Sequence, residues 1–155
     1  MIRTTGLLTG LLLLLAAQTG TPTFAQGPQP RVTIASRYNF AMTLERLESA
    51  VAANGLGIVT RANAQNGARS LGMSIPGNQV WGLFGPKFAV RMLKASVDAG
   101  FEAPVRLYIV ESAQGTVAVS YVKPSVVFTP YGRKDLDTMA QELDGLFGRI
   151  VAAVQ

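Results

Sequence analysis

The chain has 155 residues, of which 48% are hydrophobic, and its 14 basic and 9 acidic residues give a formal net charge of +5. It contains neither His nor Cys, which excludes Cys/His zinc sites, thiolate nucleophiles, cysteine-ligated iron–sulfur clusters, histidine-ligated haem and Ser-His-Asp triads. Because no disulfide can form, the fold must be stabilised by its hydrophobic core.

The N-terminal segment has the parts of a secretory signal peptide. Met1–Arg3 is a short basic region, and Gly6–Ala17 is an apolar run shorter than the roughly 20 residues that span a bilayer. Thr23-Phe24-Ala25 places small residues at the positions that a signal peptidase reads. We predict that residues 1–25 are cleaved after Ala25 and that the protein is exported by the Sec route, to the periplasm or outside the cell. The alternative is an uncleaved membrane anchor.

The remainder of the chain has the size of a single domain with one core. Residues 26–31 are polar, with two prolines, and are interpreted as a spacer. Residues 32–155 are predicted to form one domain, with elements that follow from hydrophobic periodicity and turn residues.

Strands and helices alternate along this domain. The strands expected from alternating apolar residues are Val32–Ser36, Leu56–Arg61, Gln79 or Val80 to Phe84, Val105–Val110 and Thr116–Tyr121. The expected helices are one capped by Asn39 and ended by Gly55, a short helix or turn at Asn63–Leu71, one that begins at Pro86, and a long one at Asp135–Val154. The order β-α-β-(α)-β-α-β-β-α predicts a two-layer α+β fold, in which a mostly antiparallel sheet carries its helices largely on one face. Ser125–Arg133 is expected to be a loop with an apolar centre.

Glycines mark two further features. Gly85 is expected to supply the backbone freedom that the strand exit needs, and Pro86 suits the first position of a helix. With Lys87 this joint resembles an anion cradle in outline, but Pro86 lacks an N–H that such a site would use, so capping and packing are its expected role. Gly145 and Gly148, inside the last helix, are interpreted as marks of close packing against another backbone.

A basic stripe on the helix after Pro86 is the first candidate ligand site. Each helical residue turns by about 100°, which places Lys87, Arg91 and Lys94 on one narrow face. Such a stripe is typical of an ordinary surface helix, and the alternative is a site for an anionic ligand or partner.

The predicted hairpin carries the second candidate. Arg106 and Tyr108 lie on the face opposite the apolar residues of their strand, and Tyr121 is expected at a neighbouring position on the returning strand. Lys123 follows directly and is included in this candidate surface. The two interpretations are a solvent-exposed face and a face that meets a ligand or partner.

Catalytic chemistry has little support in the sequence. The nine carboxylates are scattered, without a pair placed for glycosidase-type chemistry. No catalytic residues, metal site or cofactor is therefore predicted. An enzyme would need Glu111, Tyr108 or Lys123 to converge in a pocket. The basic residues are spread along the chain, and we expect no nucleic-acid partner.

Three stretches together resemble a known family. In order they read TLERLESAVAANGLGIV, VWGLFGPK and APVRLYIVESAQGTVAVSYVKPS, and over about Ser36 to Tyr131 they resemble the domain-of-unknown-function family 302. Members commonly carry Asn between the glycine and proline of the joint, whereas this chain reads Gly85-Pro86 directly. The resemblance implies a small α+β domain, often a homodimer, with no established activity and no agreed catalytic residues.

The sequence thus favours an exported, non-catalytic binding or interaction module. Its expected partner is a small apolar or anionic ligand or an envelope protein, with no stable membrane span after cleavage of the signal peptide. Two alternatives remain open at this point. One is a hydrolase or isomerase that uses carboxylate, Tyr or Lys groups, and the other is a structural or stress-related envelope protein.

Overall fold

The computed structural model describes residues 30–155. The predicted signal peptide, residues 1–25, and most of the predicted spacer lie outside this range. The strands are β1 (Arg31–Ser36), β2 (Gly57–Asn63), β3 (Asn78–Phe84), β4 (Val105–Glu111) and β5 (Val117–Val122). The helices are α1 (Phe40–Ala53), α2 (Ala64–Ser70), α3 (Pro86–Ala95), α4 (Pro124–Phe128) and α5 (Lys134–Ala152), with 3-10 turns η1 (Asp98–Glu102) and η2 (Thr129–Tyr131).

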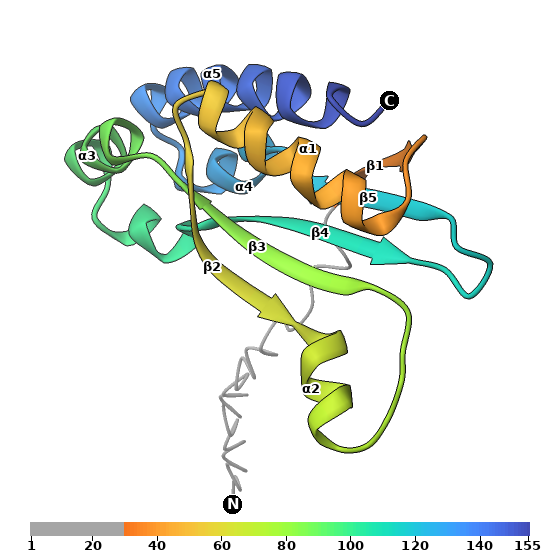
Figure 1. The fold of residues 1–155 in the computed structure, drawn as a ribbon. Helices are drawn as coiled ribbons and strands as arrows, with labels where there is room; N and C mark the ends of the chain where they lie inside the picture. Colours follow the sequence, from red (N-terminus) through yellow and green to blue (C-terminus); the bar gives the residue numbers. More distant parts are fainter. Residues whose placement is uncertain (1–29) are drawn as a thin grey trace, which may run out of the picture.

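The five strands form one antiparallel sheet in the order β1-β5-β4-β3-β2. Helices α1, α3, α4 and α5 lie over one face of this sheet, and α2 projects beyond its end (Figure 1). The predicted α+β architecture, with helices largely on one face, is confirmed. In the part of the chain that the structure describes, the opposite face carries no helix, and we call it the open face (Figure 1). None of the described helices combines the length and the apolar character that a bilayer crossing needs.

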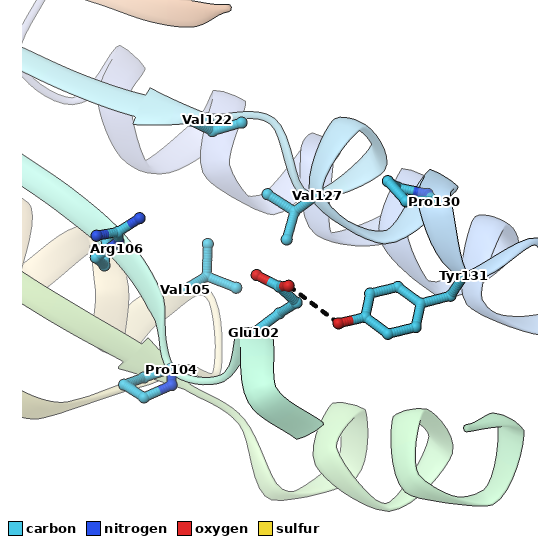
Figure 2. Close-up of a pocket in the computed structure, with 8 residues that line it drawn as sticks. All are labelled: Glu102, Pro104, Val105, Arg106, Val122, Val127, Pro130 and Tyr131. Atoms are coloured by element: carbon cyan, nitrogen blue, oxygen red, sulfur yellow. Dashed lines mark hydrogen bonds between the residues drawn. The ribbon is translucent and has the colours of Figure 1, made fainter. Parts of the chain in front are cut away.

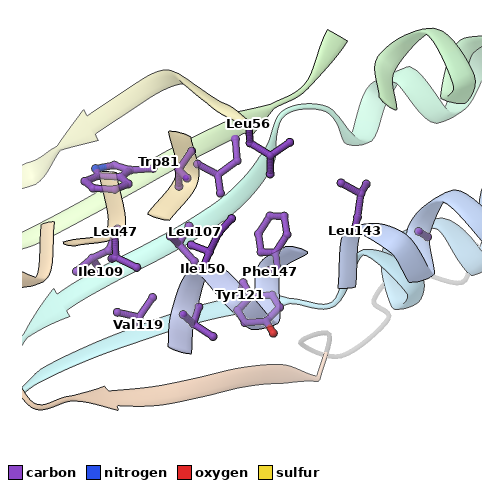
Figure 3. Packing of buried hydrophobic residues seen from close by; sticks show 14 of the residues in the cluster. Leu47, Leu56, Trp81, Leu107, Ile109, Val119, Tyr121, Leu143, Phe147 and Ile150 are labelled. Atoms are coloured by element: carbon purple, nitrogen blue, oxygen red, sulfur yellow. The ribbon is translucent and has the colours of Figure 1, made fainter. Parts of the chain in front are cut away.

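The core lies between the sheet and the helices (Figure 3). Register pairs Leu107 of β4 with Trp81 of β3, and Ile109 with Val119 of β5, so that these four side chains point to the same face. All four are fully buried. Phe147 of α5 belongs to the same buried cluster and lies in the helix layer. Because side chains alternate along a strand, the residues between these positions point to the open face.

The segment predicted as a loop, Ser125–Arg133, is helical, so that prediction is wrong. It contains most of α4 and all of η2. Pro124 suits the first turn of α4, where its missing N–H costs nothing. Asp144 of α5 accepts hydrogen bonds from the backbone N and the side-chain hydroxyl of Ser125. A carboxylate that is distant in the sequence therefore caps this short helix, which periodicity alone does not indicate.

The glycines confirm one prediction and correct two. Gly55 follows α1 with φ of +72°, the left-handed conformation expected at that helix end. Gly85 has φ of −136°, which any residue adopts; a Cβ there would lie 2.8 Å from a methyl carbon of Leu56, so space and not backbone freedom favours glycine. A Cβ on Gly145 would make only an ordinary contact and one on Gly148 would meet nothing within 4 Å, so the predicted backbone packing is wrong.

Candidate functional site

A cavity of about 320 Å³ opens where the chain enters β4 (Figure 2). Its volume is at the lower end of the range of small-molecule pockets, roughly 300–1,000 Å³. The cavity is bordered by η1, by the ends of β4 and β5, and by the α4–η2 segment. Its lining residues are Glu102, Pro104, Val105, Arg106, Val122, Val127, Pro130 and Tyr131. Apolar walls and three polar groups with different chemistry are thus combined in one hollow.

Close packing of Pro104 on the sheet sets the geometry of the entry to β4. The antiparallel register places Gly82 of β3 directly opposite Arg106. A Cβ on Gly82 would approach Cγ of Pro104 to 2.6 Å and would also collide with the hydroxyl of Thr60. A glycine at this position therefore lets the chain cross close to the sheet, and it leaves the cross-strand neighbour of Arg106 without a side chain.

Tyr131 and Glu102 form the main polar contact of the cavity. The Tyr131 hydroxyl donates a hydrogen bond of 3.0 Å to Oε1 of Glu102 (Figure 2). Partial burial raises the pKa of Tyr131 above its ordinary value of 10.0, and the hydrogen bond and negative charge of Glu102 raise it further. Tyr131 therefore stays protonated at neutral pH and acts as a hydrogen-bond donor.

Arg106 brings the opposite charge to the same cavity. It is exposed, and it extends from β4 on the open face. Within residues 30–155, the ion pairs are Arg61 with Glu48 and Arg91 with Glu142, so Arg106 has no carboxylate partner there. A guanidinium offers five N–H donors in a planar fork that matches carboxylate and phosphate groups. Arg106 is thus available to hold an anionic group.

A second cavity, of about 570 Å³, adjoins the first. Glu102, Pro104 and Arg106 line both cavities. The second one continues over small side chains of the open face, including Ala62 and Val80. The charged residues therefore stand between two hollows.

Comparison with known proteins places the domain in a family. The family model described as "Domain of unknown function DUF302" matches residues 32–154. The chain belongs to this family. An uncharacterised conserved DUF302 protein from Bacillus stearothermophilus, known from a crystal structure, is similar with a TM-score of 0.72 and 17% sequence identity. The likeness covers 81% of this chain and 98% of that one, and at this identity it shows the fold alone. No curated protein matches the chain.

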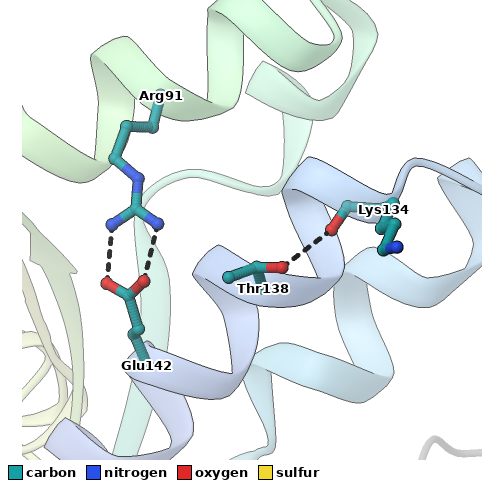
Figure 4. A network of polar contacts seen from close by, with 4 residues as sticks. All are labelled: Arg91, Lys134, Thr138 and Glu142. Atoms are coloured by element: carbon teal, nitrogen blue, oxygen red, sulfur yellow. Dashed lines mark hydrogen bonds and ion pairs between the residues drawn. The ribbon is translucent and has the colours of Figure 1, made fainter.

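The basic stripe of this DUF302 chain lies on α3 as the spacing predicts, with Lys87, Arg91 and Lys94 all exposed. Arg91, however, reaches α5, where its two terminal nitrogens donate to Glu142 at 2.6 and 2.7 Å (Figure 4). This paired hydrogen bonding raises the pKa of Arg91 and lowers the pKa of Glu142. The middle of the stripe is therefore engaged with a neighbouring helix, a contact that the sequence analysis missed because Glu142 lies 51 residues away.

The second predicted surface of this DUF302 domain is only partly assembled. Arg106 and Tyr108 share the open face as predicted, but Tyr121 does not join them, and this grouping is wrong. Register pairs Tyr108 with Ser120, so the next residue of β5, Tyr121, points to the opposite face. Its ring lies in the core, with its centroid 5.1 Å from that of Phe147. This burial, with a smaller effect of Asp144, raises the pKa of Tyr121.

The three residues that an enzyme was expected to bring together do not line the cavity. The carboxylate of Glu111 accepts a hydrogen bond from the backbone N of Gly77, at 2.9 Å. The Tyr108 hydroxyl accepts one from the Asn78 side chain, at 2.8 Å. Lys123 is exposed and directly precedes α4. Glu102 and Tyr131, which do meet there, are 29 residues apart, and no local pattern in the sequence indicates their contact.

The described residues also limit the kinds of group that could be held. In the range 30–155, no three side chains of Asp, Glu, His or Cys gather in a way that could hold a metal ion. The polar side chains among the lining residues carry a carboxylate, a phenol and a guanidinium. They suit hydrogen bonding and ion pairing with an organic ligand.

Proposed function

We propose that the mature protein is an exported binding module, and that it holds a small ligand in the cavity between Arg106 and Tyr131. The observation that supports this most is the position of Arg106. Arg106 lines a hollow of ligand size, and no carboxylate of the described residues forms an ion pair with it. Arg106 anchors an anionic group of the ligand, because charge-assisted hydrogen bonds to a guanidinium are stronger than neutral ones.

The walls of the cavity define the rest of the ligand. Val105, Val122 and Val127 present aliphatic carbon, and Pro104 and Pro130 add ring carbon. Burial of apolar ligand surface against them contributes about 25 cal/mol per Å². The ligand is therefore a small molecule with an anionic group and an apolar part.

Native mass spectrometry tests this proposal. Mature protein is incubated with the small-molecule extract of its host, washed and measured without denaturation. We expect a bound molecule on the wild type and on Lys123→Gln, the matched control that removes an exposed charge outside the cavity. Arg106→Gln should lose the molecule. Absence of any bound small molecule from the wild type would overturn the proposal.

Export is the second part of the proposal. It is supported by the basic, apolar and small-residue regions that precede the domain. The measurement is N-terminal sequencing of protein from the native host, which should begin at Gln26, together with fractionation into periplasm and medium. A cytosolic protein that retains Met1 would contradict it.

We also propose a homodimer, in line with the family resemblance. Val90, Leu93, Val97 and Phe101 on α3 and after it are exposed large hydrophobic residues, and Phe101 is 89% exposed. Contiguous exposed apolar surface is typical of interaction sites. Lys94 and Asp98 lie among these residues in the sequence, which suits a two-fold interface, because each copy offers the charge that the other needs.

Light scattering during gel filtration measures the oligomeric state. Wild-type protein should elute as a dimer, and Phe101→Ser should shift it toward the monomer because a large apolar contact is removed. Val59→Ser, an exposed position on β2, is the matched control and should stay dimeric. A monomeric wild type at high concentration would contradict the dimer.

An enzyme remains the second candidate, and the Glu102–Tyr131 contact favours it. A carboxylate and a protonated phenol in one cavity are a possible pair for general acid–base chemistry. The extract experiment separates the two functions. A binding module returns its ligand chemically unchanged, whereas a hydrolase or isomerase would deplete the bound species and release a product.

A further inference from the structure

The cavity holds a positive and a negative side chain that do not pair with each other. Arg106 and Glu102 both line it, yet the ion pairs found within the described range join other residues. The charged atoms of these two side chains are therefore more than 4.0 Å apart. In the view of Figure 2, Val105 lies between Arg106 and the Glu102 carboxylate, which faces Tyr131.

Each charge is kept in its place by a separate part of the fold. Glu102 ends η1, and the Tyr131 hydroxyl holds one of its carboxylate oxygens. Arg106 belongs to β4, beyond Pro104, which packs tightly over Gly82. A ligand that enters the cavity therefore meets both charges, and the second oxygen of Glu102 remains able to accept a hydrogen bond.

This arrangement disfavours ligands with a single charge. Opposite charges attract and like charges repel, and both effects are stronger near a protein surface than in bulk water. A simple anion at Arg106 would be repelled by Glu102, and a simple cation at Glu102 would be repelled by Arg106. A molecule with one charge of each sign satisfies both residues.

We propose that the ligand is a small zwitterion of the amino-acid type with an aliphatic side chain. Its carboxylate accepts hydrogen bonds from Arg106, its ammonium donates to Glu102, and its side chain packs against Val122 and Val127. This inference rests on the proposed binding function and names the chemical class of its ligand. The paired charges give selectivity, because a ligand that lacks either group leaves one side chain of the protein uncompensated.

Three matched probes test the inference by calorimetric titration of the mature wild-type protein. Leucine carries both charges, 4-methylpentanoate lacks the ammonium group, and 3-methylbutylamine lacks the carboxylate. We expect leucine to bind about ten- to hundredfold more tightly than either of the others, since a hydrogen bond to a charged group contributes about 1.5–3 kcal/mol. Binding of 4-methylpentanoate as tight as that of leucine would overturn the zwitterion and leave the anion-binding function standing. Absence of binding by all three would also overturn the zwitterion, and the extract experiment would then decide the binding function separately.

Two variants test which residue binds each charged group of the ligand. Glu102→Gln should weaken the binding of leucine about tenfold or more, and it should leave the binding of 4-methylpentanoate unchanged or make it tighter. The reason is that the amide oxygen of Gln still accepts a hydrogen bond from Tyr131 but carries no charge. Arg106→Gln should weaken the binding of both probes, and Lys123→Gln should change the binding of neither. Circular dichroism and thermal unfolding confirm that each variant is folded. Wild-type affinity for leucine in folded Glu102→Gln would overturn the inference.

Discussion

Neighbouring residues on β4 show how the two faces of the sheet differ. Leu107 is fully buried under the helix layer, whereas Tyr108 is half-buried on the open face and bonds to Asn78 through its hydroxyl. The covered face is also tightly filled, and an apolar cavity beside Phe88 and Met92 measures only about 30 Å³. The hollows of about 320 and 570 Å³ lie where the open face meets η1 and the α4–η2 segment.

The closely packed core and the proposed binding surface therefore lie on different sides of the sheet. A space of about 30 Å³ admits about one water molecule, so this cavity has no room for an organic ligand. The larger hollows carry Arg106, Glu102 and Tyr131, groups that would be costly to bury without partners. In the proposed function, the core therefore stays closely packed while the other side holds the ligand.

The largest expected effect comes from truncating the covered face. Leu107→Ala should lower the free energy of unfolding by about 2–5 kcal/mol, because it removes buried methyl groups and leaves a cavity. Tyr108→Ala should cost less, about 1–2 kcal/mol, because it removes one hydrogen bond and a ring that is only half-buried. Urea unfolding measures the loss of unfolding free energy in both variants, provided that the m-value is unchanged. An equal loss for the two variants would show that the open face is also buried in solution.

A smaller loss is expected at the entry to β4. Gly82→Ala should destabilise the protein by about 1–3 kcal/mol, the cost of overpacking, because its Cβ collides with Thr60 and Pro104. Gly57→Ala is the matched control on β2, since its Cβ would meet only a backbone oxygen of Phe84 at 3.8 Å. Thermal and urea unfolding compare the pair. A neutral Gly82→Ala would mean that Pro104 moves without cost.

A substitution in α5 is expected to stabilise the protein. Gly148→Ala should raise the free energy of unfolding by about 1 kcal/mol, because alanine favours a helix interior over glycine and the added Cβ meets open space. Urea unfolding is again the measurement. Destabilisation would revive the interpretation that this glycine marks close packing, for example against a second copy of the chain.

The pKa values of two tyrosines, one at the cavity and one in the core, test the difference between the two faces. The pKa of Tyr131 is raised partly by Glu102, whereas the pKa of Tyr121 is raised mainly by core burial. Because the folded-state pKa lies above 10.0, the unfolded chain ionises first, and stability is lost as the pH rises above that value. Glu102→Gln should lower the pKa of Tyr131 and leave that of Tyr121 unchanged.

Ultraviolet titration of tyrosinate measures this effect, and the difference between the wild type and Tyr131→Phe isolates the signal of Tyr131. An unchanged Tyr131 titration in Glu102→Gln would show that the two side chains are not in contact in solution. A shift of Tyr121 in the same variant would contradict the separation of the two faces.

Local patterns in the sequence determined much of the fold. Asn39 accepts a hydrogen bond from the backbone N of Met42 as a helix cap should, Gly55 has the predicted left-handed conformation, and the apolar face of α5 is buried. These features depend on residues within a few positions of one another, so periodicity and capping rules identify them. The absence of His and Cys likewise excludes whole classes of chemistry by composition alone.

Tertiary structure alone decided the candidate site. Strand register, and not the spacing within β5, turned Tyr121 into the core. Folding brought together Glu102 and Tyr131 across 29 residues and Arg91 and Glu142 across 51. Such contacts depend on where separate elements pack, and no short-range pattern encodes that placement. The sequence therefore determined the elements and their order, and the packing of those elements determined which charges face the cavity.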